Sequence, residues 1–482
     1  MFALPAMGSG RRLCVVLLVA FVAVLVFDVR HRLCVDYLGA LRLLADSASK
    51  NVILGDCVVT GAESLSSVLT ALSIADSAEL FAPHWEESVA ALAGATPWLL
   101  APDRIQSQST DAALPDEAVR EVLRVAQLVS DDPDLRLLLW HCCRLLYEHL
   151  DYPAQMVTRW PNLDQRLGKD SPLFYFLLTL ASVCLARQKH EELGIPGDVA
   201  CANAKNVFGH GERQVLTTGR WGTEQRLLPW MRNHTTGELF RLGRLHFMIR
   251  PFRGCVRAFR NRESGAVAAL AVDGTRFVEP GILLHGKVAE GRRAWVASFS
   301  EDGDGYHGVP VSPWGYACEE EITLDRSGWE PALTPGDPMI EVHIPGGGGM
   351  TVERVRDAMT HALDFFPRYF PERPFVGFVC TSWVFNARFS EILPPEANIR
   401  QNQEQVYLYP VSSGGRDGVY FIFGTDVVDP ATSPRDTSIQ RVMLSELEAE
   451  RPLLTGGMFL LLDDFSAFGK QAYRGRWPFE VG

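Results

Sequence analysis

The sequence predicts an α/β protein in which a helical N-terminal domain precedes a domain built on a mixed sheet. Between about Val35 and His190, apolar residues recur at helical spacing. After Gly194 the apolar runs become short and are bounded by Gly, Asp and Arg, as strands usually are. From Gly336 a strand, a glycine loop, a helix and a second strand follow one another, and this order indicates a parallel crossover.

The composition is that of a globular protein and not that of a general nucleic-acid binder. The 482 residues are 47% hydrophobic and 22% charged, with a formal net charge of -12. Nucleic-acid binding needs clustered Lys and Arg to neutralise phosphates. One stretch, residues 205–263, is locally basic. It could meet an anionic ligand or form a solvated basic face.

An unbroken apolar run, Leu13–Phe27, precedes the helical domain and has arginines on both sides. It is shorter than the roughly 17–25 residues of most spanning helices, and no small-residue cleavage site follows it. Three interpretations of residues 1–34 stay open: a membrane anchor, a buried core helix, or an extension added upstream of the true start.

Three segments predict helices of the N-terminal domain, at residues 117–130, 132–150 and 171–190. Asp132 and Pro133 suit the N-cap and the first turn of the second helix. The third helix has polar ends, so we expect it to pack in a core rather than to span a membrane. Nine segments predict strands: residues 242–250, 266–272, 282–288, 294–300, 339–345, 374–385, 405–411, 418–424 and 456–463.

The glycine loop lies between a strand at residues 339–345 and an amphipathic helix at residues 352–366. Glycines let a ligand approach the backbone, and the first N–H groups of a helix have no internal partners, so this segment can bind an anion. The residues so placed are Gly346, Gly347, Gly348, Gly349, Met350 and Thr351. The loop matches neither a Walker loop nor a Rossmann fingerprint. The alternative is a tight connecting turn.

The ten cysteines indicate reduced thiols. No C-x-x-C pair occurs, and most of the cysteines stand in apolar runs, where a free Cys behaves as a small hydrophobe. We therefore expect no metal site and a cytoplasmic main body, held at a membrane only if Leu13–Phe27 is an anchor.

Several sequence blocks resemble one bacterial family, which joins a helical N-acyltransferase domain to a GNAT-like C-terminal domain. The blocks are LFRLGRLHF (239–247), GDPMIEVHIPGGGGMT (336–351), FFPRYFPERPFVGFVCTSWVF (365–385), ILPPEANI (392–399) and the strand Tyr407–Pro410. The resemblance covers about residues 50–470. We expect a helical domain at 35–195 and a GNAT-like domain at 196–475, whose cofactor half starts near 336.

The resemblance implies that the protein uses a coenzyme A thioester, either acetyl-CoA or another acyl-CoA. In GNAT enzymes the loop after the fourth core strand binds the CoA pyrophosphate through backbone N–H groups. That role would fall on Ile344 and on the loop Gly346–Thr351. The usual Gln or Arg at the start of the loop is missing here, where Pro345 ends the strand.

Acyl transfer to an amine needs a positioned thioester, a base for the ammonium group and an acid for the leaving thiolate. Glu341 and His343 share one face of the strand that leads to the loop, so His343 is the predicted base, with Glu341 as its alternate. Tyr407 and Tyr409 share a strand face, and either could be the acid. The alternatives are a core histidine bonded to backbone and tyrosines that only pack in the sheet.

The predicted function is acyl-CoA-dependent acyl transfer to an unidentified acceptor, for which an amine is one candidate. Two alternatives stay open. One is a binding or regulatory protein that keeps the GNAT fold without the chemistry, because no base is unambiguous. The other is a membrane-anchored scaffold, which only Leu13–Phe27 supports. The expected partners are acyl-CoA, the acceptor and, through that run, a membrane, with no nucleic acid.

Overall fold

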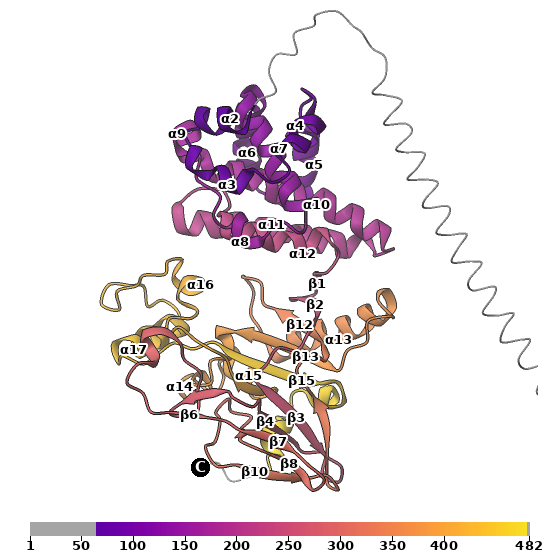
Figure 1. The fold of residues 1–482 in the computed structure, drawn as a ribbon, viewed down its shortest axis with the longest axis vertical. Coiled ribbons are helices and arrows are strands. Elements are labelled where there is room, and N and C mark those ends of the chain that lie inside the picture. Colours follow the sequence, from indigo (N-terminus) through magenta and orange to yellow (C-terminus); the bar gives the residue numbers. More distant parts are fainter. Residues whose placement is uncertain (1–63, 480–482) are drawn as a thin grey trace, which may run out of the picture. The chain divides into compact units, whose positions relative to one another are not determined.

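The computed structural model describes residues 64–479 (Figure 1). Helices fill the first part of this range, and strands begin at Phe240. The apolar run Leu13–Phe27 lies outside the described residues, so its interpretation stays a prediction.

The helical domain extends further along the chain than the sequence predicts. Its helices are α2 (Leu65–Ala71), α3 (Ala78–Phe81), α4 (Trp85–Leu92), α5 (Pro102–Asp111), α6 (Asp116–Asp131), α7 (Pro133–Tyr147), α8 (Ala154–Val157), α9 (Asp164–Leu167), α10 (Ser171–Glu192), α11 (Gly197–Thr218) and α12 (Met231–Thr235). The predicted boundary at 195/196 falls between α10 and α11. The glycines and polar residues of α11 hide its helical periodicity, which explains the early boundary.

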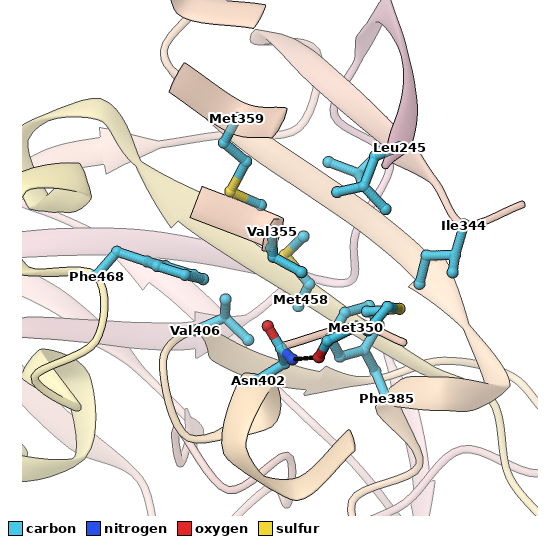
Figure 2. A pocket seen from close by; sticks show the side chains of 11 residues that line it. Leu245, Ile344, Met350, Val355, Met359, Phe385, Asn402, Val406, Met458 and Phe468 are labelled. Carbon is cyan, nitrogen blue, oxygen red and sulfur yellow. Dashed lines mark hydrogen bonds between the residues drawn. The ribbon is translucent and has the colours of Figure 1, made fainter. Parts of the chain in front are cut away.

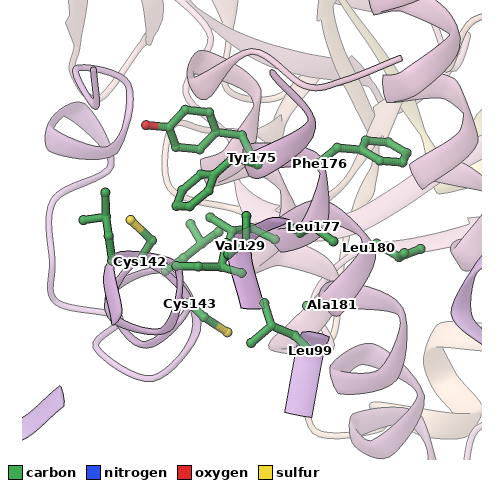
Figure 3. Close-up of a cluster of buried hydrophobic side chains, with 14 of the residues drawn as sticks. Leu99, Val129, Cys142, Cys143, Tyr175, Phe176, Leu177, Leu180 and Ala181 are labelled. Carbon is green, nitrogen blue, oxygen red and sulfur yellow. The ribbon is translucent and has the colours of Figure 1, made fainter. Parts of the chain in front are cut away.

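Helix α10 forms the centre of the helical core. Its Tyr175 and Phe176 are almost completely buried, together with Val129 of α6 and Cys142 of α7 (Figure 3). By length and composition alone α10 could cross a membrane, but 78% of its most apolar window is buried within the protein. This burial fits the predicted core helix.

The second part is built on a six-stranded mixed sheet. Its strand order is β1 (Phe240–Leu242), β2 (Leu245–Pro251), β12 (Pro338–His343), β13 (Gly377–Ser382), β15 (Gly456–Leu461) and β14 (Tyr407–Pro410). Strands β12 and β13 are parallel and are joined by α13 (Val352–Tyr369), which confirms the predicted crossover. The apolar stripe of α13, including Val355, Met359 and Phe366, belongs to the same core as the sheet.

Smaller sheets and short helices complete the domain. One sheet has the strand order β11 (Trp329–Leu333), β3 (Val256–Asn261), β4 (Val267–Ala271) and β9 (Pro310–Val311). A second has the order β10 (Ile322–Asp325), β8 (Gly305–Gly308) and β7 (Phe299–Glu301). The third pairs β5 (Arg276–Val278) with β6 (Ala294–Val296). The helices are α14 (Phe389–Ile392), α15 (Asn398–Gln403), α16 (Val419–Phe423), α17 (Ser438–Glu448) and α18 (Ala472–Gly475).

Three predicted strands differ from the structure. Residues 418–424 form the short helix α16, which glycines in the left-handed region cap at both ends. Residues 282–288 make only isolated bridges and then a turn of 3₁₀ helix. Residues 294–300 divide into β6 and β7, which join different sheets. Each is a short apolar run, and such runs do not distinguish a strand from a helical turn.

Candidate acyl-CoA site

The glycine loop leaves the end of β12 and enters α13 through a defined cap. The Thr351 side chain accepts a hydrogen bond from the Arg354 backbone N–H at 3.4 Å, so it caps the helix. Gly347 and Gly348 have φ angles of +74° and +64°, a conformation that favours glycine. All four loop glycines are exposed, and a Cβ on Gly346 or Gly347 would meet no atom within 4 Å. The loop is therefore open to an approaching ligand.

Arginines from two other segments surround this loop. Arg244, in the turn between β1 and β2, donates to the Gly348 carbonyl at 3.3 Å, and Arg354 of α13 donates to the Gly349 carbonyl at 3.4 Å. Burial lowers the pKa of Arg244, and the charges of Arg241 and Arg354 lower it further. Within residues 64–479 none of these three arginines has a carboxylate partner, and Arg244 Nε makes no hydrogen bond. The loop thus carries uncompensated positive charge, which suits phosphate groups.

The predicted base and its alternate lie side by side on β12. His343 Nε2 lies 3.8 Å from Glu341 Oε2, and the two side chains are 27% and 31% exposed. The ring of Trp230, from the end of the helical domain, meets the His343 ring edge-on at 4.8 Å between centroids. In the described part of the chain, His343 Nε2 has no hydrogen-bond partner. The Nε2 atom itself is buried on the Glu341 side, so only the rest of the half-buried ring can be reached from outside.

Two buried histidines lie behind His343. His246 stands directly opposite it on β2, and the His234 ring lies 5.9 Å from the His246 ring. Burial lowers the pKa of His234 to about 3 and holds that of His246 well below its ordinary value. Both rings are therefore neutral at physiological pH, and His343 is the histidine of this group that reaches solvent.

Tyr407 does not fit its predicted role as the acid. Its ring is completely buried, and its hydroxyl donates to the Val311 carbonyl at 2.6 Å and accepts from the Ala269 N–H at 3.1 Å. Burial also holds the pKa of Tyr407 well above its ordinary value. The strand pattern identified the face on which Tyr407 lies but not that β4 and β9 cover this face. Tyr409 is 2% exposed and packs against Phe252.

Strands β12 and β13 separate beside the candidate base. Their parallel pairing joins only Ile340 to Phe378 and Glu341 to Val379. On its other edge β12 stays paired with β2 as far as His343, while β13 follows β15. The end of β12 therefore presents a backbone edge that no described strand fills, where an extended amide chain could bind.

An apolar pocket opens at this separation (Figure 2). Its cavity has a volume of about 20 Å³, enough for little more than one water molecule, and it is lined by Leu245, Val342, Ile344, Met350, Val355, Met359, Phe385, Asn402, Val406, Met458 and Phe468. Asn402 donates to the Met350 carbonyl at 2.7 Å, but its Oδ1 atom is buried and accepts no hydrogen bond from the described residues. The pocket thus offers an apolar lining and one free acceptor.

The structure brings together residues that the sequence analysis treated separately. The loop, Ile344 and the pair Glu341–His343 all lie at one end of β12. Arg244, Arg354 and Trp230 were not predicted from the sequence as site residues. The basic character of residues 205–263 was a signal for Arg244, whereas nothing in the sequence placed Trp230 beside His343.

Comparisons with known proteins identify the family and the fold. Residues 103–237 match a family model described as an N-acyltransferase N-terminal domain, and residues 239–459 match a GNAT-like C-terminal domain. An acyltransferase solved with decanoyl-CoA and teicoplanin is 19% identical, with a TM-score of 0.55, over 83% of this chain and 99% of that chain. A mutant acyltransferase solved with octanoyl-CoA is 18% identical, with a TM-score of 0.53 and the same coverage. No curated protein matches.

The fold and the site define an acyl-CoA-dependent acyltransferase of the GNAT-like class. The chain belongs to the family that joins an N-acyltransferase N-terminal domain to a GNAT-like C-terminal domain.

Proposed function

We propose that this protein transfers a medium-length acyl group from acyl-CoA to a primary amine. The observation that carries the proposal is the meeting of three features at one end of β12: the basic glycine loop, the apolar pocket and the pair Glu341–His343. The N-acyltransferase description of the matched N-terminal model supports an amine acceptor. The octanoyl-CoA and decanoyl-CoA held by the structural neighbours support a medium-length chain.

The residues present fit acyl-CoA as a substrate. The loop Gly346–Thr351, with Arg244 and Arg354, would hold the phosphates, because it offers backbone N–H groups and unpaired guanidinium groups. The free edge of β12 and Asn402 Oδ1 suit the amide groups of the pantetheine arm. The apolar side chains that line the pocket would surround the acyl chain, after parting from the cavity of about 20 Å³ that they enclose here.

His343 would remove a proton from the amine. The amine nitrogen forms a bond to the acyl carbon, the carbon–sulfur bond breaks, and the leaving thiolate takes up the proton that His343 removed, so an amide and a free thiol result. The thioester supplies the activated acyl group. Glu341 would orient the His343 ring and stabilise its protonated form, since the carboxylate stays ionised at neutral pH.

A binding experiment and a turnover experiment together test the proposal. The Gly347→Val variant forces a β-branched residue to a φ of +74° and adds bulk where phosphate should approach. Calorimetry should then show weaker CoA binding, while Gly303→Ala, at an exposed site outside the loop with open space and an ordinary φ, should bind normally. Release of free thiol from octanoyl-CoA that depends on an added amine would separate a transferase from a binding protein. Unchanged CoA affinity in Gly347→Val would contradict the loop assignment.

We also infer a cytoplasmic location for the main body. The described cysteines are all free, as expected in a reducing compartment. Cell fractionation tests the inference, and recovery of the protein from an oxidising compartment would contradict it.

A further inference from the structure

A cluster of three metal-ligand side chains lies on the helical domain, away from the residues assigned above. His84 precedes α4, Glu87 stands in the first turn of α4, and His149 follows the end of α7. Their ligand atoms all lie within 4.8 Å of one another. The sequence predicted no metal site, because no C-x-x-C pair occurs; His149 stands 62 residues after Glu87, and only the fold brings the two together.

The ligand atoms of the cluster are spaced more widely than in a bound tetrahedral zinc site. His84 Nδ1 lies 3.1 Å from Glu87 Oε1, and His149 Nε2 lies 3.9 Å from Glu87 Oε2. In a tetrahedron with zinc–ligand bonds of about 2.0–2.1 Å, ligand atoms stand roughly 3.3–3.4 Å apart. The two imidazole rings stack at 3.7 Å between centroids, with 11° between their planes, so the rings must turn before both lone pairs can point at one ion.

One ligand atom of the cluster is buried without a partner. His149 is 15% exposed, and its Nε2 atom is buried without a hydrogen-bond partner among the described residues. His84 Nδ1 lies 3.1 Å from the Glu87 carboxylate, within hydrogen-bond distance, and would release its proton to an incoming ion.

A rigid polar contact fixes the two helices that carry these ligands. Ser88, next to Glu87, accepts a hydrogen bond from the Trp140 indole through its carbonyl at 3.2 Å. Its hydroxyl lies 2.8 Å from His141 Nδ1 and 3.3 Å from Arg144 Nη1. The start of α4 is thus held against α7, which fixes the ligands in position before any ion binds.

We propose that His84, Glu87 and His149 bind one Zn²⁺ ion that joins α4 to the end of α7, with water in the fourth position. Two imidazole nitrogens and one carboxylate are a donor set that zinc accepts in proteins. The ion would stabilise the folded helical domain by mass action, because it binds the folded chain and not the unfolded one.

The test uses the full chain, stripped with a chelator and dialysed, and titrated with zinc sulfate in a calorimeter. We expect one zinc ion per chain at this site and a higher Tm in its presence. Loss of a side chain that binds the ion directly should weaken zinc binding by more than the roughly 10–100-fold that loss of an outer contact causes. His149→Gln and Glu87→Gln should therefore abolish measurable binding, and the exposed control His361→Gln on α13 should not.

The absorption of Co²⁺ in place of zinc adds an independent readout, because tetrahedral sites absorb strongly in the visible range. The Tm of each metal-free variant shows whether it still folds. If His149→Gln does not fold, Glu87→Gln serves instead, because the Glu87 side chain is exposed. The proposal is overturned if the wild-type chain takes up no zinc. It is equally overturned if folded Glu87→Gln binds zinc as the wild type does.

Discussion

His343 lies 3.8 Å from Glu341 on the same face of β12, with Nε2 of the imidazole directed at Oε2 of the carboxylate. Burial raises the pKa of Glu341, but the contact with His343 and the charges of Arg250 and Arg253 outweigh burial and lower it. An ionised carboxylate beside a solvent-reaching imidazole is the arrangement that a general base with an orienting partner requires.

The first prediction concerns this pair. His343→Gln keeps the size and hydrogen bonding of the side chain but cannot accept a proton near neutral pH. We expect kcat to fall by about 10²–10⁴-fold while the Kd for CoA stays unchanged, because other residues hold the phosphates. The acidic limb of the pH–rate profile should disappear as well.

Glu341→Gln and His361→Gln are the companion variants. Glu341→Gln should lower kcat less than His343→Gln does if the histidine is the base. It should lower kcat more if the carboxylate is the base. His361→Gln, exposed on α13, should behave as the wild type. Full turnover of both site variants at every pH would contradict the assignment of either residue.

The crossover and its loop could be predicted from sequence because the signals are local. A strand, a glycine run and an amphipathic helix lie within about thirty residues, and the Thr351 cap follows from the same pattern. Arg354 lies in that segment too, but its role depends on Arg244, which comes from a hairpin about a hundred residues earlier. Only the pairing of β2 with β12 brings the two arginines together.

Tyr407 shows the opposite case. Alternation along a strand identifies which residues share a face, but what covers that face is a tertiary property. Here β4 and β9 cover it, and their backbone groups use both hydrogen-bonding positions of the Tyr407 hydroxyl. The place of Trp230 beside His343 depends on tertiary packing in the same way.

The second prediction concerns the arginines at the loop. Arg244→Gln and Arg354→Gln should each weaken CoA binding by about 10–150-fold, the equivalent of roughly 1.5–3 kcal/mol for a charge-assisted hydrogen bond. Calorimetry with CoA and with pantetheine measures the effect, since pantetheine lacks the phosphates and should bind both variants normally. Arg368→Gln, at the far end of α13, is the control. An equal loss for pantetheine would show that the arginines act on the fold and not on the phosphates.

The third prediction concerns the apolar pocket. Each buried methylene contributes about 0.8 kcal/mol, or roughly fourfold in affinity, so decanoyl-CoA should bind about 15-fold more tightly than octanoyl-CoA. Ile344→Trp places a larger ring in the pocket and should remove this gain. Acetyl-CoA, whose acyl group is short, should be affected far less. If affinity rises with acyl-chain length equally in the wild type and in Ile344→Trp, the acyl chain lies outside this pocket.

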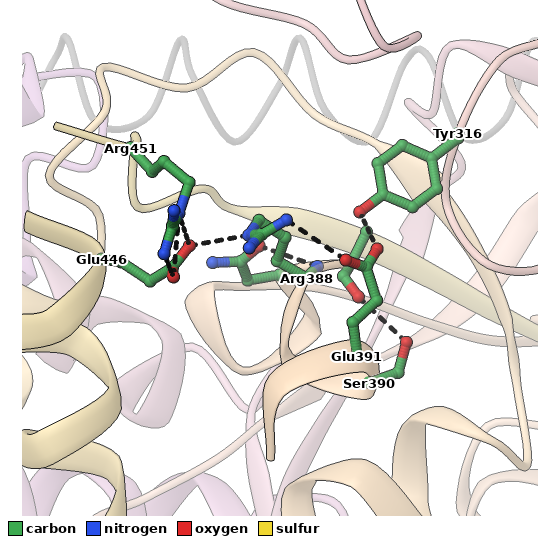
Figure 4. Close-up of polar contacts among 8 residues, drawn as sticks. Tyr316, Arg388, Ser390, Glu391, Glu446 and Arg451 are labelled. Atoms are coloured by element: carbon green, nitrogen blue, oxygen red, sulfur yellow. Dashed lines mark hydrogen bonds and ion pairs between the residues drawn. The ribbon is translucent and has the colours of Figure 1, made fainter. Parts of the chain in front are cut away.

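The last prediction concerns an ion-pair network in the C-terminal part of the chain (Figure 4). The Glu446 side chain is only 4% exposed and pairs with Arg388 Nε at 2.7 Å and Arg451 Nη2 at 2.6 Å. Arg388 also pairs with Glu391, which accepts a hydrogen bond from the Tyr316 hydroxyl at 2.6 Å. The network thus connects α17 to the start of α14 through Arg388, and α14 to the segment before β10 through Glu391 and Tyr316.

Glu446→Gln should lower the free energy of unfolding by about 2 kcal/mol at pH 7, because it removes charge-assisted hydrogen bonds to two arginines. Burial raises the pKa of Glu446, but its bonds to Arg451 and Arg388 outweigh burial and lower it. A carboxylate with a lowered folded-state pKa stabilises the protein above its unfolded-state pKa, and this contribution is lost as the pH falls through the folded-state value. Denaturant unfolding should therefore show a difference from the wild type that is largest at neutral pH and shrinks below about pH 4.5.

Glu448→Gln on the same helix breaks an exposed pair with Arg435 and should cost less than about 1 kcal/mol. A pH-independent difference for Glu446→Gln would mean that packing, and not charge, holds α17 in place.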